Sequence, residues 1–172
     1  FGRTTEERRV TAQGFEEKLG VNHLGHFLLT NLLLPELQRS RSSRVVVVSS
    51  SLHDPAERGM GGTPCTLDLD DLQLTQPGAY EAAFAYKRSK LANILFTYEL
   101  RRRLQAAGSH GVHVSALSPG FIPTTNLSRE AGPLAQFFLR WVLDGVLKWV
   151  GLVTVTRSID EGATCCVLCA IE

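Results

Sequence analysis

The sequence lacks the features that mark membrane-spanning or nucleic-acid-binding proteins. Its 172 residues contain no uninterrupted apolar run of about twenty, which argues against a spanning helix. Lysine and arginine number 18 against 17 acidic residues, and the formal net charge is +1. Without a basic excess there is little to neutralise a phosphate backbone, so we expect no nucleic-acid partner. The sequence starts at Phe1 without a signal-peptide pattern, which leaves any targeting signal either absent or upstream.

Cysteine is scarce, and its spacing does not predict a metal site. Of four cysteines, Cys65 stands alone, and Cys166-x-x-Cys169 has the spacing of half a zinc site. No second pair of histidines or cysteines has suitable spacing to complete four ligands. The neighbours of these cysteines are apolar, so we interpret them as small buried hydrophobes in a reducing, intracellular compartment.

Two catalytic motifs are also missing. No Gly-x-Ser-x-Gly elbow occurs, which excludes a typical α/β-hydrolase. The glycines of residues 59–62 neither follow a strand nor open a helix, so they do not predict a phosphate-binding loop.

The hydrophobic pattern that is present alternates between helices and strands. A helix is predicted over residues 11–37, with Thr11 as N-cap and Pro35 bending or ending it. The apolar β-branched run at residues 44–50 predicts a strand covered on both faces. The later elements are a helix over residues 80–106, a strand over 111–117, and helices over 133–150 and 158–171. This order is typical of an α/β, Rossmann-like, doubly wound parallel sheet.

Only two strong strands are visible, too few for an open sheet that covers two layers of helices. We therefore interpret residues 1–172 as one partial domain, the C-terminal portion of a larger fold.

Tyr86 and Lys90 lie one helical turn apart, on the same face of the predicted helix. A nearby ammonium favours phenolate over phenol, so we expect the pKa of Tyr86 to fall from about 10 toward neutrality. Taken alone this spacing is common, and its weight comes from the motifs around it.

Four segments in order, residues 21–27, 45–50, 86–90 and 118–124, together resemble the short-chain dehydrogenase/reductase family. Within that family they look most like the branch that holds retinol dehydrogenases, the WW-domain oxidoreductase and protochlorophyllide reductase. The resemblance covers residues from about 11 to 171.

The resemblance implies four catalytic residues. Ser50 would donate a hydrogen bond to the substrate oxygen, with Ser49 and Ser51 as neighbouring alternatives. Tyr86 would be the general acid or base, and Lys90 would lower its pKa and hold the nicotinamide ribose. Asn22 would hold a water that links Lys90 to solvent. The alternative for Asn22 is a helix residue bonded to backbone.

The resemblance also implies a dinucleotide cofactor. Pro119, Gly120, Ile122 and Thr124 match positions near the nicotinamide, with Thr125 as an adjacent alternative to Thr124, and Tyr86 and Lys90 would also contact the cofactor. NADP is inferred from the branch alone, and NAD is not excluded. The family's glycine-rich turn, its cofactor selector and its Asn-Asn-Ala-Gly strand have no counterpart here, which fits a fragment.

Two segments bear on the substrate. Residues 134–150 carry a polar stripe at every fourth position on an otherwise apolar helix that includes Trp141 and Trp149. It would form a lid over an apolar substrate with peripheral membrane contact, or pack against the rest of the fold or a second subunit of a homo-oligomer. The acidic residues 68–71 would border the substrate pocket or form a surface insertion.

We therefore expect an NADP-dependent enzyme that interconverts a carbonyl and an alcohol on a small lipophilic substrate, such as a retinoid, steroid or fatty aldehyde. The alternatives are reduction of a ring double bond, as in protochlorophyllide reductase, or a protein without catalytic activity. The sequence does not choose between a cytoplasmic, a membrane-associated and a plastid location.

Overall fold

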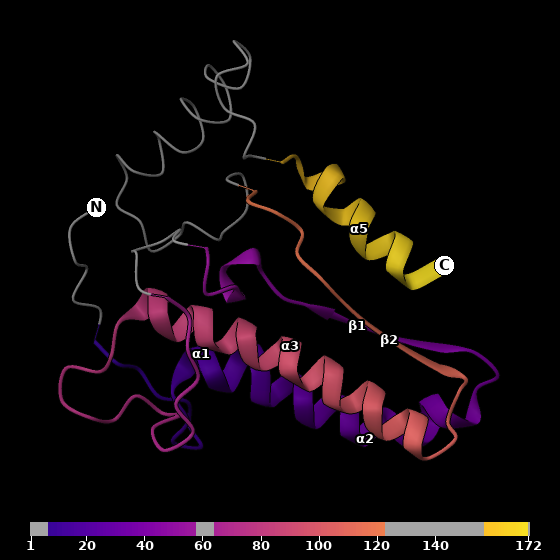
Figure 1. The fold of residues 1–172 in the computed structure, drawn as a ribbon, viewed down its shortest axis with the longest axis horizontal. Coiled ribbons are helices and arrows are strands. Elements are labelled where there is room, and N and C mark those ends of the chain that lie inside the picture. Colours follow the sequence, from indigo (N-terminus) through magenta and orange to yellow (C-terminus); the bar gives the residue numbers. More distant parts are fainter. Residues whose placement is uncertain (1–6, 58–63, 123–156, 172) are drawn as a thin grey trace, which may run out of the picture. The chain divides into compact units, whose positions relative to one another are not determined.

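The computed structural model describes residues 7–57, 64–122 and 157–171, drawn in colour in Figure 1. The chain divides into two compact units, residues 1–116 and 117–172. Each unit is described by itself below.

The first unit begins with a continuous run of helix, and a glutamate caps the N-terminus of that run. It comprises α1 (Glu17–Leu19), a π-helical turn (Gly20–Leu24) and α2 (Gly25–Arg39). The carboxylate of Glu16 accepts the backbone N–H groups of Lys18 and Leu19, at 3.0 and 2.7 Å. The prediction of Thr11 as N-cap is therefore wrong. Thr11 belongs to the preceding turn, where its hydroxyl oxygen accepts the N–H of Phe15 at 3.3 Å.

Pro35 does not end this helix, because α2 continues through it to Arg39, and the alternative expectation that it bends the helix stays a prediction. Proline cannot donate to the carbonyl four residues earlier, which here belongs to Asn31. Both residues are exposed, so water can satisfy that carbonyl and the helix tolerates the break.

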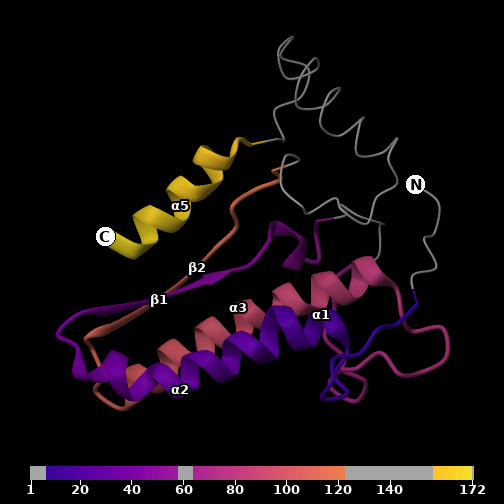
Figure 2. The same cartoon turned by 180° about the vertical axis from the view of Figure 1, so that it is seen from behind.

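The two predicted strands are confirmed, and a long helix connects them. β1 (Ser43–Val48) and β2 (Val112–Leu117) pair in a parallel sheet, joined by α3 (Ala82–Ala106). Figures 1 and 2 show α2 and α3 running side by side along one side of these strands. This α/β arrangement confirms the predicted fold class, that of a Rossmann-like fragment.

The core of the first unit lies where the last turns of α3 meet β2. Its buried members are Leu100, Leu104 and Val112. Partly buried side chains from α2, α3 and both strands complete it: Leu34, Leu37, Val45, Phe96 and Val114. Within the described part, β1 itself is half-buried and Val48 is exposed. Among the described residues, β1 is therefore not covered on both faces as predicted.

The second unit contains α5 (Ile159–Ile171), which confirms the last predicted helix. A capping box starts it, because Ser158 Oγ accepts the N–H of Glu161 while the Glu161 carboxylate accepts the N–H of Ser158. The segment before the helix is held by a backbone bond from Arg157 N–H to the carbonyl of Phe121, at 2.8 Å. The helix predicted over residues 133–150 lies outside the described residues.

Within the described ranges, none of the helices is long and apolar enough to cross a membrane. Those same ranges contain no cluster of three potential metal ligands, and their four cysteines are free thiols.

Candidate functional site

Ser50 and Tyr86 meet where β1 ends and α3 begins. Ser50 follows the strand and opens the short 3-10 helix Ser51–His53, where its Oγ accepts the N–H of Leu52 at 3.3 Å. Tyr86 lies in the second turn of α3, and the side chains of Tyr86 and Ser50 are hydrogen-bonded to each other. Two hydroxyl groups, one after the strand and one from α3, therefore lie next to each other at the carboxyl end of a parallel strand, which is where ligands bind in open α/β sheets.

Lys90 extends over the same site. Its Nζ lies 5.7 Å from the centre of the Tyr86 ring and donates to the carbonyl of Val48 at 3.1 Å. These contacts bring together three of the four predicted catalytic residues, from a strand end and one face of a helix.

The neighbouring serines are not equivalent. Ser49 is buried, and its hydroxyl donates to the backbone carbonyl of Lys90 at 2.8 Å. Ser50, in contrast, bonds the Tyr86 side chain. The geometry therefore favours Ser50 over Ser49 as the serine that faces the reacting groups.

The expected acidification of Tyr86 is wrong for this structure. Burial raises the pKa of the Tyr86 phenol above its usual value, and the hydrogen bond from Ser50 offsets this only in part. Burial also lowers the pKa of the Lys90 ammonium. Desolvation disfavours the charged form of both groups, so at neutral pH Tyr86 is a protonated phenol.

Asn22 lies in the π-helical turn and faces α3. Its side-chain amide donates to Ser89 Oγ at 3.1 Å, and its backbone carbonyl accepts from His26 Nδ1 and Asn93 Nδ2, both at 3.0 Å. Two protein donors thus engage the carbonyl of Asn22. The role of Asn22 in holding a water near Lys90 stays a prediction.

The predicted cofactor residues Pro119, Gly120 and Ile122 belong to the second unit. Gly120 has φ +84°, a backbone conformation that favours glycine, and a Cβ there would come within 2.8 Å of the Cδ of Arg157, whose side chain would have to move. Thr124 and its alternative Thr125 lie outside the described residues. The contacts of all four predicted positions with a dinucleotide stay predictions.

Sequence reasoning missed the residues that surround these groups. Asn93 bonds His23, Asn22 and Val48, and His53 Nδ1 contacts the carbonyl of Ser50 at 2.5 Å. The signal that the sequence offered was weak: a polar residue, Asn93, within the apolar run of residues 91–96 that follows Lys90.

The acidic segment, residues 68–71, contacts α3 through Arg88 and not through the side of the helix that carries Tyr86. Arg88 is buried, and its guanidinium donates to the carbonyls of Asp68 and Asp71, at 2.8 and 3.0 Å. Arg88 is two positions after Tyr86, which turns it by about 200° around the helix axis. The segment therefore packs on the opposite face of α3, which favours a surface insertion over a wall of the substrate pocket.

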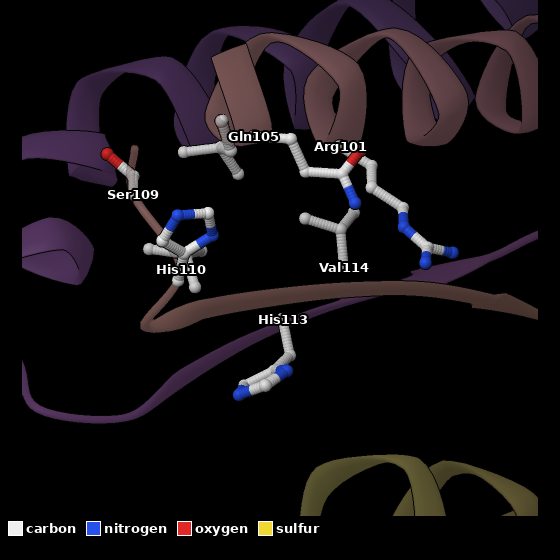
Figure 3. A pocket seen from close by; sticks show the side chains of 8 residues that line it. Arg101, Gln105, Ser109, His110, His113 and Val114 are labelled. Carbon is white, nitrogen blue, oxygen red and sulfur yellow. The ribbon is translucent and has the colours of Figure 1, made fainter. Parts of the chain in front are cut away.

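A pocket of about 300 Å³ occurs elsewhere in the first unit, between the last turns of α3 and β2 (Figure 3). It is lined by Arg101, Leu104, Gln105, Ser109, His110, Val112, His113 and Val114. Arg101 is fifteen residues after Tyr86, or about 22 Å along a helix. This pocket is separate from the Ser50–Tyr86 site.

Comparison with known proteins supplies strong similarities, although no protein-family model matches the chain. It is 50% identical to human retinol dehydrogenase 14 over 120 residues, or 70% of this chain and 31% of that protein. It is 41% identical to human polyprenol dehydrogenase over 170 residues, or 95% and 44% of the two chains. It is 37% identical to the WW domain-containing oxidoreductase of Danio rerio over 163 residues, or 95% and 35%.

Among solved structures, an uncharacterized protein from Mycobacterium paratuberculosis superposes with a TM-score of 0.57 at 39% identity. The match covers 90% of this chain and 47% of that one. The chain spans less than half the length of each of these relatives.

Proposed function

Because this chain belongs to the short-chain dehydrogenase/reductase family, we propose that the protein that carries it interconverts an alcohol and a carbonyl on a lipophilic substrate with a nicotinamide dinucleotide. The relatives named retinol dehydrogenase and polyprenol dehydrogenase, by those names, act on lipophilic alcohols. These names support a substrate such as a retinoid, a steroid or a fatty aldehyde. NADP, the cofactor expected of this branch, is proposed over NAD.

The observation that carries the proposal is the Ser50–Tyr86 hydrogen bond beneath the Lys90 ammonium. Two hydroxyl groups side by side can both reach one substrate oxygen: Ser50 donates a hydrogen bond to it, and Tyr86 transfers the proton. The dinucleotide, when bound, supplies or accepts the hydride.

The donor set also suits the sugar of a dinucleotide. A ribose diol needs donors close together, and the Tyr86 hydroxyl and the Lys90 ammonium extend from the same face of α3. Lys90 is anchored by the Val48 carbonyl, so its position is set before any ligand arrives.

The raised pKa of Tyr86 bears on the direction of reaction. A phenol that stays protonated at neutral pH is ready to give a proton to the oxygen of a carbonyl. The reverse reaction requires the phenolate as base. At neutral pH the phenol is therefore in the protonation state that carbonyl reduction needs.

The test uses the full-length protein with retinal, a ketosteroid and a long-chain aldehyde, each with NADPH or NADH, followed at 340 nm. Tyr86→Phe should lower kcat by about 10²–10⁴. Tyr98→Phe, on the same helix but 68% exposed, is the matched control and should keep the parent rate. If Tyr86→Phe turns over as fast as the parent, the catalytic assignment fails. Light-dependent reduction of protochlorophyllide, without turnover of any aldehyde, would favour the alternative reaction.

Peripheral membrane contact through residues 134–150 stays a prediction, since that segment lies outside the described residues. Flotation of the full-length protein with liposomes, compared between the parent and a Trp141→Ser, Trp149→Ser variant, tests it. No association of the parent with the liposomes would leave packing within the protein or in a homo-oligomer as the role of this segment.

A further inference from the structure

Asn93 occupies the centre of the polar contacts that surround the proposed site. It lies on α3, one turn after Lys90, and is only 2% exposed. Its Nδ2 donates to the backbone carbonyls of Asn22, at 3.0 Å, and Val48, at 3.3 Å. Its Oδ1 lies 3.0 Å from His23 Nδ1. The two N–H groups and the oxygen of this buried amide are therefore all engaged.

These partners settle which way the amide faces. Backbone carbonyls only accept hydrogen bonds, so the NH2 group must point to Asn22 and Val48. The amide oxygen then faces His23, and because that oxygen cannot donate, Nδ1 of His23 must carry a proton. A neutral His23 is thereby fixed in one tautomer, with Nε2 unprotonated.

The amide shares an acceptor with the proposed catalytic lysine. The carbonyl of Val48 accepts hydrogen bonds from both Asn93 Nδ2 and Lys90 Nζ. A further hydrogen bond joins the end of β1 to α3, and here the donor is on the strand side: Ser49 Oγ donates to the backbone carbonyl of Lys90. The end of β1 is thus fastened to one face of α3 just before Ser50 leaves the strand.

We propose that Asn93 is a positioning residue for the proposed reaction, because its amide fastens the end of β1 and the π-helical turn to α3. It thereby sets where Ser50, and the Val48 carbonyl that accepts from Lys90 Nζ, stand relative to Tyr86. This inference rests on the proposed function and extends it to a residue that does not touch the substrate. A purely structural asparagine would contribute stability alone.

The kinetic test compares three variants of the full-length protein. Asn93→Leu keeps the size of the side chain and loses all its bonds, and should lower kcat about 10–100-fold with little change in KM, because misplacement of catalytic groups acts on the chemical step. Asn93→Asp keeps an acceptor for His23 but loses both N–H donors, and its kcat should fall as far as that of Asn93→Leu. Full activity of Asn93→Asp would show that only the His23 contact matters and would overturn the proposal.

Thr97→Val is the matched control. Thr97 is also buried on α3, and its hydroxyl donates to the carbonyl of Asn93 at 2.8 Å, one turn further from Lys90. It should lower the melting temperature as Asn93→Leu does while it keeps the parent kcat. Equal kcat losses in the two variants, in step with their stability, would overturn the proposal.

A readout without turnover separates this inference from the proposed function. The Ser50–Tyr86 hydrogen bond lowers the pKa of Tyr86, so displacing the strand end should raise that pKa in Asn93→Leu but not in Thr97→Val. Tyrosine ring-carbon NMR follows it, and nitrogen NMR should show His23 with an unprotonated Nε2 in the parent. If no substrate is turned over, the proposed function fails, and these spectra still decide the role of Asn93. The proposed role of Asn93 would be overturned if the pKa of Tyr86 were the same in Asn93→Leu as in the parent, or if neutral His23 carried its proton on Nε2.

Discussion

The ammonium nitrogen of Lys90 lies over the Tyr86 ring, 5.7 Å from its centre, in a place where burial opposes the charge of both groups. A cation over an aromatic face is attracted by the ring electrons, whether or not the phenol is ionised. The proximity of an ammonium is therefore not enough to make this phenol acidic.

Ser50→Ala should raise the pKa of Tyr86 further, because it removes the hydrogen bond that partly offsets desolvation. Ser51→Ala, at the exposed next position, should leave it unchanged. The measurement is a titration by tyrosine NMR. The same shift makes stability depend on pH. Because the pKa of Tyr86 in the folded state lies above the unfolded value of about 10, its contribution to the free energy of unfolding is fully present below pH 10. That contribution is lost as the pH rises through the folded-state pKa. A Tyr86 that titrates below 10 in the parent would contradict this account.

Arg88→Met should release the segment that holds Asp68 and Asp71, because the two backbone carbonyls lose their buried donor. We expect a loss of about 1–3 kcal/mol in the free energy of unfolding, measured with urea. Arg88→Lys should restore little, since a single ammonium does not reproduce the fork of the guanidinium. Arg101→Met, an exposed position on the same helix, is the control, and an equal loss there would refute the anchoring role.

Gly162→Ala should disturb the second unit, because a Cβ at this position of α5 would overlap the Cδ1 methyl of Ile122. The Ile122 side chain must rotate, at a cost of about 1 kcal/mol. Ile122→Val removes that methyl, so the double variant should be more stable than the sum of the single variants predicts. Strict additivity in thermal unfolding would show that the two residues do not contact each other.

Glu99 should titrate with a pKa of about 2, because hydrogen bonds from Arg102 and Arg103 stabilise its carboxylate. A depressed pKa means that the contribution to stability is present above the unfolded value near 4.5 and is lost as the pH falls through about 2. Arg102→Gln should raise this pKa, and so should high salt, which screens an exposed pair. Carboxyl NMR between pH 1 and 5 measures it, and a midpoint near 4.5 at low salt would contradict the prediction.

The sequence predicted best where one strong pattern decides the structure. The apolar β-branched run at residues 44–50 predicted β1, and the helix predicted over residues 80–106 lies within two residues of the observed α3. The order of helices and strands then sufficed for the fold class.

It predicted poorly where the outcome depends on tertiary burial or on competition between neighbours. Glu16 rather than Thr11 caps the first helix, although both side chains can accept backbone N–H groups. The pKa of Tyr86 depends on how much water the fold removes, which the spacing to Lys90 does not reveal. Asn93 was missed because its partners, Asn22 and Val48, are 71 and 45 positions away along the chain.

The π-helical turn Gly20–Leu24 has a consequence for alignments of this chain with its relatives. A π turn holds one residue more than an α turn, and so resets by about 100° the direction in which every preceding side chain points. Deleting His23 or Leu24 would leave a regular helix that still contains Asn22, yet it would turn the Asn22 side-chain amide away from Ser89, the acceptor of its hydrogen bond. A relative with a one-residue gap at this turn could therefore keep the asparagine in its sequence and still lose the contacts that join the turn to α3.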